Sequence, residues 1–157
     1  MKKMGIDTVV LIRCGYKQWL TYPSEYLQKE VGCYKPELDL VELFLQLCDK
    51  YNMSFFFGLY DSGKYWINKE YEKEVEINKE VINEVWQLYG HYRAFKGWYL
   101  THEISRLNKH IVNLYATLGA YGKSQSNSLK TLISPYSDGA KNRSQHTSKV
   151  PKEKKIS

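Results

Sequence analysis

Four short apolar runs along the chain predict β-strands. They cover residues 6–12, 54–59, 95–100 and 131–134, and each contains β-branched or aromatic side chains. The first run, Ile6–Ile12, has almost no polar alternation, which is typical of a strand covered on both faces of a parallel sheet. Met4-Gly5, just before this run, resembles the end of a helix whose body would precede Met1.

Amphipathic segments between these strands predict helices. Asp39 is a helix-capping residue type, and the segment from there to about Tyr51 repeats apolar side chains every three or four positions. Cys48 is expected on the apolar face of this helix as a small buried thiol. The other residues expected on this face are Leu40, Phe44, Leu47 and Tyr51.

A longer helix is predicted over residues 71–89, and a third helix follows it. The apolar stripe of the longer helix is expected to consist of Val75, Ile82, Val85, Trp86 and Tyr89. Its solvated face is expected to carry Glu72, Glu76, Lys79, Glu80 and Glu84. The third helix is marked by Ile111, Val112, Tyr115 and Leu118.

This alternation of strands and helices predicts an α/β fold with parallel strands joined by right-handed crossovers. The 157 residues can bury a sizeable core, but a complete eight-stranded α/β barrel needs roughly 250 residues. Residues 1–140 are expected to form this domain. Within it, residues 13–36 form a long, aromatic-rich connection of the kind that is usually functional.

The charge of the chain is concentrated at its end. There are 23 Lys and Arg and 17 Asp and Glu residues, which give a formal net charge of +6. Residues 141–157 hold six of those bases and one of the acids, so they are expected to form a flexible, polar, basic tail on an almost neutral domain. This distribution argues against nucleic-acid binding. No apolar run approaches the roughly 20 residues of a membrane span, and no signal-peptide segment follows Met1.

The cysteines and histidines do not indicate a metal site. Cys14, Cys33 and Cys48 form no Cys-x-x-Cys pair and are expected to be unpaired. Neither a zinc-ligand spacing nor a Gly-rich phosphate loop after a strand is present. The sequence therefore predicts no metal and no cofactor.

The loops that follow the predicted strands are rich in aromatic rings and carboxylates. Function in parallel α/β folds collects at this end of the sheet. Because rings stack on the C–H faces of sugars and carboxylates accept hydroxyl hydrogen bonds, the pattern favours a carbohydrate ligand. For the loop residues Trp19 and Trp66, packing of the loop on itself is the alternative. The candidate binding residues are Arg13, Tyr16, Trp19, Tyr60, Asp61, Trp66, Tyr99, Tyr136 and Asp138.

Glu103 is the candidate catalytic acid. It comes directly after the apolar strand 95–100, where packing does not require an ionisable residue. A partly desolvated glutamic acid can give a proton to a departing glycosidic oxygen near neutral pH. The alternative is a carboxylate that caps the next helix. His102 is a second catalytic candidate, which either orients Glu103 or points away from it.

Several short motifs, taken in order, resemble a known family. The motifs are Met4-Gly5-Ile6-Asp7-Thr8-Val9-Val10, Tyr22-Pro23-Ser24, Phe57-Gly58-Leu59, Gly97-Trp98-Tyr99 through Glu103, and Ile133-Ser134-Pro135-Tyr136. Together they resemble domain-of-unknown-function family 4434 over almost the whole chain. Its members are bacterial TIM-barrel proteins regarded as candidate glycoside hydrolases, frequently exported and sometimes carrying an additional C-terminal domain.

The resemblance implies a partial (β/α)8 TIM barrel that corresponds to strands two to five and is truncated at both ends. Glu103 would then follow strand four, where many barrel glycosidases place their acid/base, although those enzymes typically have Asn where this chain has His102. Their second carboxylate usually follows strand seven, and neither Asp61 nor Asp138 matches that position. Because glycoside hydrolysis normally uses two carboxyl groups, whether the chain is an enzyme stays open. The isolated chain is expected to show no turnover.

Three functions remain as alternatives. The first is a segment of a glycoside hydrolase-type barrel that acts on or binds carbohydrate. The second is a non-catalytic carbohydrate-binding barrel, and the third is a protein-interaction module that uses the basic tail as a tether. Open sheet edges would also favour self-association. The sequence does not specify the compartment.

Overall fold

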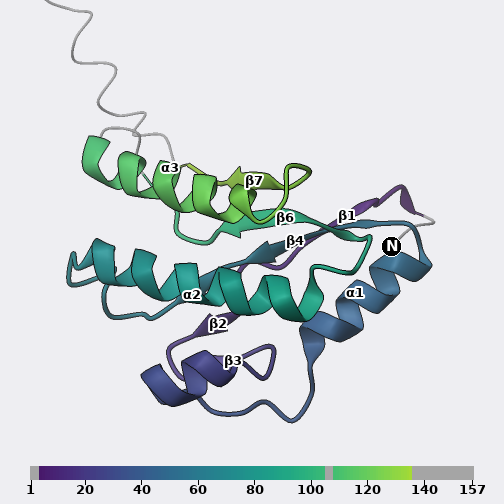
Figure 1. Cartoon of the computed structure of the whole chain (residues 1–157), viewed down its shortest axis with the longest axis horizontal. Helices are drawn as coiled ribbons and strands as arrows, with labels where there is room; N and C mark the ends of the chain where they lie inside the picture. Colours follow the sequence, from purple (N-terminus) through teal and green to yellow (C-terminus); the bar gives the residue numbers. More distant parts are fainter. Residues whose placement is uncertain (1–3, 105–107, 136–157) are drawn as a thin grey trace, which may run out of the picture.

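A parallel four-stranded sheet forms the centre of the fold. The computed structural model describes residues 4–104 and 108–135. The strands lie in the order β1-β4-β6-β7, and each adjacent pair is parallel (Figure 1). Their bounds are β1 Thr8–Val10, β4 Ser54–Gly58, β6 Phe95–Leu100 and β7 Lys130–Ile133. The predicted α/β fold with about four parallel strands is therefore confirmed.

Three α-helices connect these strands. They are α1 (Leu40–Lys50), α2 (Tyr71–Tyr89) and α3 (Lys109–Ser124). The predicted cap is present on α1, because Asp39 Oδ1 accepts a hydrogen bond of 2.9 Å from the N–H of Glu42. Since the strands follow one another in a single direction across the sheet, right-handed crossovers place all three helices on the same face. None of the described helices is long and apolar enough to span a membrane.

The core lies between the sheet and the helices. Phe57 of β4 and Trp98 of β6 are fully buried, with ring centroids 5.9 Å apart. The indole N–H of Trp98 donates to the carbonyl of Gly122 on α3 at 2.8 Å, so the polar edge of the ring is satisfied inside the core. Gly97 has φ 153°, and a Cβ there would lie 1.9 Å from the carbonyl oxygen of Lys130. A side chain at position 97 would therefore prevent β6 and β7 from pairing.

The buried face of α1 differs from the predicted one. The structure buries Val41, Leu45 and Cys48, whereas Leu47 and Tyr51 are 40% and 50% exposed. The burial of Cys48 is confirmed. This Leu-rich segment contains two overlapping apolar stripes at helical spacing. Packing against β4 buries the stripe that contains Val41 and Leu45, whereas the sequence predicted burial of the stripe that contains Leu47 and Tyr51.

Strand β1 is not covered on both faces, contrary to the prediction. Val9 packs against the core, but Thr8 and Val10 point to the opposite side and are exposed. Ile12, just beyond the strand, is 60% exposed. The physical reason is that the helices cover only one face of the sheet.

The long connection after β1 supplies two strands of a second, smaller sheet, and the third strand follows β4. Its strands are β2 (Gly15–Tyr16), β3 (Trp19–Leu20) and β5 (Tyr60–Asp61), in the order β3-β2-β5. A short π-helix, Leu27–Val31, follows β3. Figure 1 shows this part of the chain as purple and dark blue ribbon on the far side of α2 from α3. Asp61 lies in β5, just after the end of β4, and the pairing of β5 with β2 holds it at this end of the main sheet.

Candidate functional site

Three charged or ionisable side chains meet at the carboxyl ends of neighbouring strands. Arg13 follows β1, Asp61 ends the segment after β4, and His102 follows β6. Arg13 Nη1 donates to Asp61 Oδ2 at 2.9 Å, and His102 Nε2 lies 3.3 Å from Asp61 Oδ1. The structure therefore brings together three of the residues selected from the sequence, at the end of the sheet where they were expected.

Asp61 is the centre of this group. Its side chain is only 10% exposed, and its Oδ1 also accepts the N–H of Gly63 at 2.8 Å. Burial alone would raise the pKa of Asp61, but His102, the Gly63 N–H and Arg13 together outweigh burial and hold the pKa below its ordinary value. Asp61 is thus an ionised carboxylate at neutral pH.

Glu74, in the first turn of α2, completes the group, although the sequence pattern did not single it out. It is almost fully buried, and its carboxylate accepts the backbone N–H of Ser62 at 2.8 Å and the hydroxyl of Ser62 at 2.5 Å. Burial raises the pKa of Glu74, with the hydrogen bonds from Ser62 acting in the opposite direction. A signal was present in the sequence, because Glu74 and Asn78 share a helical stripe with the buried Val81 and Val85.

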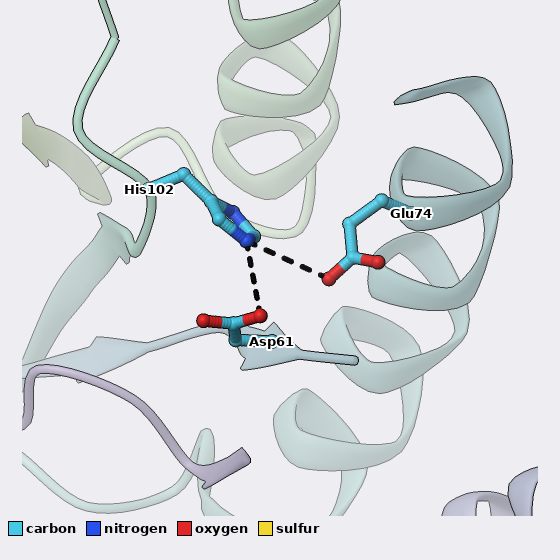
Figure 2. Close-up of side chains that lie close together, drawn as sticks. All are labelled: Asp61, Glu74 and His102. Carbon is cyan, nitrogen blue, oxygen red and sulfur yellow. Dashed lines mark ion pairs between the residues drawn. The ribbon is translucent and has the colours of Figure 1, made fainter. Parts of the chain in front are cut away.

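His102 projects into the space between the two carboxylates, as Figure 2 shows. Its Nε2 lies 3.3 Å from Asp61 Oδ1 and 3.7 Å from Glu74 Oε1, and it is buried with no hydrogen-bond partner. The other ring nitrogen, Nδ1, is 3.0 Å from the hydroxyl of Tyr115, which also accepts the backbone N–H of His102 at 3.0 Å. Trp66 stacks on the imidazole with ring centroids 4.1 Å apart. These contacts fix the plane of the ring, so His102 faces the helices and not the uncovered side of the sheet.

Glu103, the predicted acid, lies beyond the end of β6 and is exposed. It does not cap α3, because that position belongs to Asn108, whose side chain accepts the N–H of Ile111 at 3.2 Å. The capping alternative for Glu103 therefore does not apply, while its role as a proton donor stays a prediction.

The predicted aromatic contacts fall into two groups. Trp19 and Tyr16 are 71% and 40% exposed, and Trp19 makes an edge contact with Tyr34. Tyr60 and Trp66 are packed instead: Tyr60 is fully buried with its hydroxyl donating to the carbonyl of Lys17 at 2.5 Å, and Trp66 contacts His102, Tyr71 and Tyr115. A ligand could reach Tyr60 only if this part of the chain moved.

The remaining predicted residues lie near β7. The hydroxyl of Tyr99, on β6, donates to the hydroxyl of Ser134 at 3.0 Å. Its neighbour Trp98 contacts α3, so the two alternate across the sheet as expected for successive strand residues. Tyr136, Asp138 and the predicted tail 141–157 lie outside the described residues.

A second, half-buried polar centre surrounds Glu84 on α2, which the sequence placed on the solvated face. Its carboxylate accepts hydrogen bonds from the hydroxyl of Tyr22 at 2.9 Å, the hydroxyl of Ser24 at 2.5 Å and the backbone N–H of Tyr26 at 3.0 Å. The expectation of a solvated Glu84 was therefore wrong, because the segment after β3 folds back onto α2. Glu84 anchors this segment and lies apart from the strand ends.

The parallel sheet, its one-sided helical layer and the charged group at its strand ends define a protein of the (β/α)-barrel type. The chain belongs to the family described as "Domain of unknown function (DUF4434)", whose model matches residues 1–155. The family resemblance seen in the sequence is thereby confirmed.

One solved structure is closely similar. It comes from Bacteroides thetaiotaomicron and is described as a "putative alpha-L-fucosidase". It is 50% identical to this chain with a TM-score of 0.82, over 93% of this chain and 45% of the other. The chain thus spans less than half the length of that protein. No curated protein matches the chain.

Proposed function

We propose that this chain is part of a glycoside hydrolase-type barrel whose strand ends bind carbohydrate. The observation that carries the proposal is the meeting of Arg13, Asp61 and His102 from three successive parallel strands. In barrel enzymes the carboxyl ends of the strands form the active site, whatever the chemistry. The similar solved structure supports carbohydrate as the ligand class, and α-L-fucosides are the first compounds to test.

In this proposal Glu103 is the residue that faces the sugar. Trp98 and His102 both contact α3, through Gly122 and Tyr115 respectively. Side chains alternate along a strand, so Tyr99 lies on the opposite side of β6 from Trp98, which is the inner side of a barrel. Glu103 follows the end of β6 and is exposed, and in this proposal it reaches the same side as Tyr99. An exposed carboxylic acid on that side can donate a proton to a glycosidic oxygen.

Catalysis by this chain alone is not expected. Hydrolysis with retention or inversion normally needs a second carboxyl group facing the first across the scissile bond. Among the described strand-end residues, Asp61 is the other carboxylate, and it is buried against Arg13 and Gly63. We therefore propose that the isolated chain binds sugar without hydrolysing it.

A non-catalytic carbohydrate-binding role is the second candidate. The exposed pair Trp19 and Tyr34 favours it, because exposed rings provide a stacking surface that needs no proton donor. In this role Glu103 would only accept hydrogen bonds from sugar hydroxyls.

A binding and turnover assay with a panel of glycans, α-L-fucosides included, separates these proposals. Both predict saturable binding by the 157-residue chain. Loss of affinity in Glu103→Gln, with unchanged affinity in the surface control Glu76→Gln, supports a ligand at the strand ends. A larger loss in Trp19→Ala than in Glu103→Gln supports the stacking role instead. Absence of binding to the whole panel would contradict both.

A further inference from the structure

We propose that Asp61, Glu74 and His102 together bind a divalent transition-metal ion of the zinc class. The three donor atoms, one from each side chain, lie within 4.8 Å of one another. They come from β5, from the first turn of α2 and from the segment after β6, so an ion would join three separate elements (Figure 2). This inference does not depend on the carbohydrate proposal.

The distances fit metal ligands better than hydrogen bonds. A charge-assisted hydrogen bond between a ring N–H and a carboxylate is about 2.7–2.9 Å long. Here Nε2 of His102 is 3.3 Å from Asp61 Oδ1 and 3.7 Å from Glu74 Oε1, and it makes a hydrogen bond with neither. An ion with bonds of about 2.0–2.1 Å in tetrahedral geometry holds its ligand atoms about 3.3–3.4 Å apart. The separation between Nε2 and Asp61 matches that value, and the separation between Nε2 and Glu74 exceeds it. All three donor atoms lie within 4.8 Å of one another, so the carboxylates would move slightly closer around an ion.

The surroundings of His102 match those of a metal-binding imidazole. Its side chain is nine-tenths buried, and the unpartnered Nε2 points at the two carboxylates. Nδ1 lies 3.0 Å from the hydroxyl of Tyr115, and the stacked Trp66 fixes the ring plane. A partner at the second ring nitrogen typically orients a histidine ligand and fixes its tautomer.

Charge and space are also compatible with an ion. Asp61 and Glu74 both lie beside His102, and of these two carboxylates Arg13 contacts only Asp61, so Glu74 has no arginine or lysine partner among the described residues. A divalent ion would supply a positive charge between the two carboxylates. Glu74 and His102 also line a cavity of about 10 Å³, which is room for about one water molecule as a fourth ligand.

The competing explanation is a protonated His102 that pairs with both carboxylates and binds nothing. The proposal predicts one bound metal ion per chain, and the competing explanation predicts none. The test uses the whole 157-residue chain, stripped with a chelator and then dialysed against Zn²⁺, with bound metal measured by mass spectrometry. His110→Gln is the matched control, because His110 is an exposed histidine that also pairs with a glutamate, Glu72, at 2.9 Å.

We expect one equivalent of Zn²⁺ in the wild type and in His110→Gln, and at least tenfold weaker binding in His102→Gln and Glu74→Gln. Co²⁺ added to the wild type should give the visible absorption of a tetrahedral site. This measurement does not depend on whether any variant folds. Equal binding by all four proteins would show adventitious surface binding and overturn the proposal. Absence of stoichiometric Zn²⁺ and of the Co²⁺ bands in the wild type would overturn it as well.

Discussion

The indole ring of Trp66 lies almost parallel to the imidazole ring of His102, with an interplanar angle of 12° and centroids 4.1 Å apart. Trp66 also contacts Tyr71 and Tyr115, so it holds the loop after β5 against α2 and α3. From the sequence, Trp66 could either stack on a sugar or pack its own loop against the domain. In the structure its ring makes the packing contacts. Trp66 therefore packs the loop against the helices, whereas Trp19 is exposed and free to contact a ligand.

Replacing Trp66 should destabilise the fold. Removing a largely packed Trp side chain leaves a cavity, so Trp66→Ala should lower the free energy of unfolding by about 2–4 kcal/mol in urea denaturation. The control Trp19→Ala removes a side chain that is 71% exposed and should change it by no more than about 0.5 kcal/mol. Equal effects of the two substitutions would contradict the packing assignment.

The Glu84 centre should contribute strongly to stability. Glu84→Gln replaces a carboxylate oxygen by an amide N–H₂ that cannot accept from Tyr22, Ser24 and Tyr26 together. The expected loss is about 2–3 kcal/mol of unfolding free energy, because buried donors are left unsatisfied. Glu80→Gln, an exposed position on the same helix, should be nearly neutral. A stability of Glu84→Gln within error of the wild type would rule out an anchoring role for this carboxylate.

The cysteines should be unreactive in the folded chain. Cys14, Cys33 and Cys48 are all buried and free of disulfides. Burial raises the pKa of each thiol above its ordinary value, so less of the reactive thiolate is present at neutral pH. A colorimetric thiol reagent should label the native chain slowly and label three thiols after unfolding. Rapid labelling of the native chain would contradict the observed burial.

The exposed strands should promote self-association. β1 and β7 each pair on one side only within the described residues, and Val10, Ile12 and Ile133 are 39%, 60% and 49% exposed. Sedimentation velocity should show concentration-dependent association, which Ile12→Lys reduces by placing a charge beside the open edge. A monomer at every concentration would argue against this use of the edges.

The sequence predicted the four-stranded sheet and its three helices because most of their hydrophobic periods were unambiguous. The helix expected over residues 71–89 occupies those residues, and the strand expected over 95–100 is β6. Prediction failed where two patterns competed. Around Leu40–Lys50 two apolar stripes overlap, and only the contact with β4 decides between them.

Part of the candidate site could also be predicted from the sequence. Asp61, Arg13 and His102 could be placed together because strand ends of a parallel sheet converge. Glu74 was not selected, and Glu84 was expected on the solvated face, because a glutamate on a long charged helix usually faces solvent. Their partners, Ser62 and Ser24, come from loops whose path no local pattern specifies.

The most direct test of the proposed carbohydrate site is a backbone-amide NMR titration of the 157-residue chain with the same glycan panel. We predict saturable shifts at the strand ends, centred on Arg13, Tyr99 and Glu103, and none at the opposite end of the sheet, around Met53 and Ala94. Saturable shifts confined to the opposite end, or no shifts with any glycan, would contradict the account.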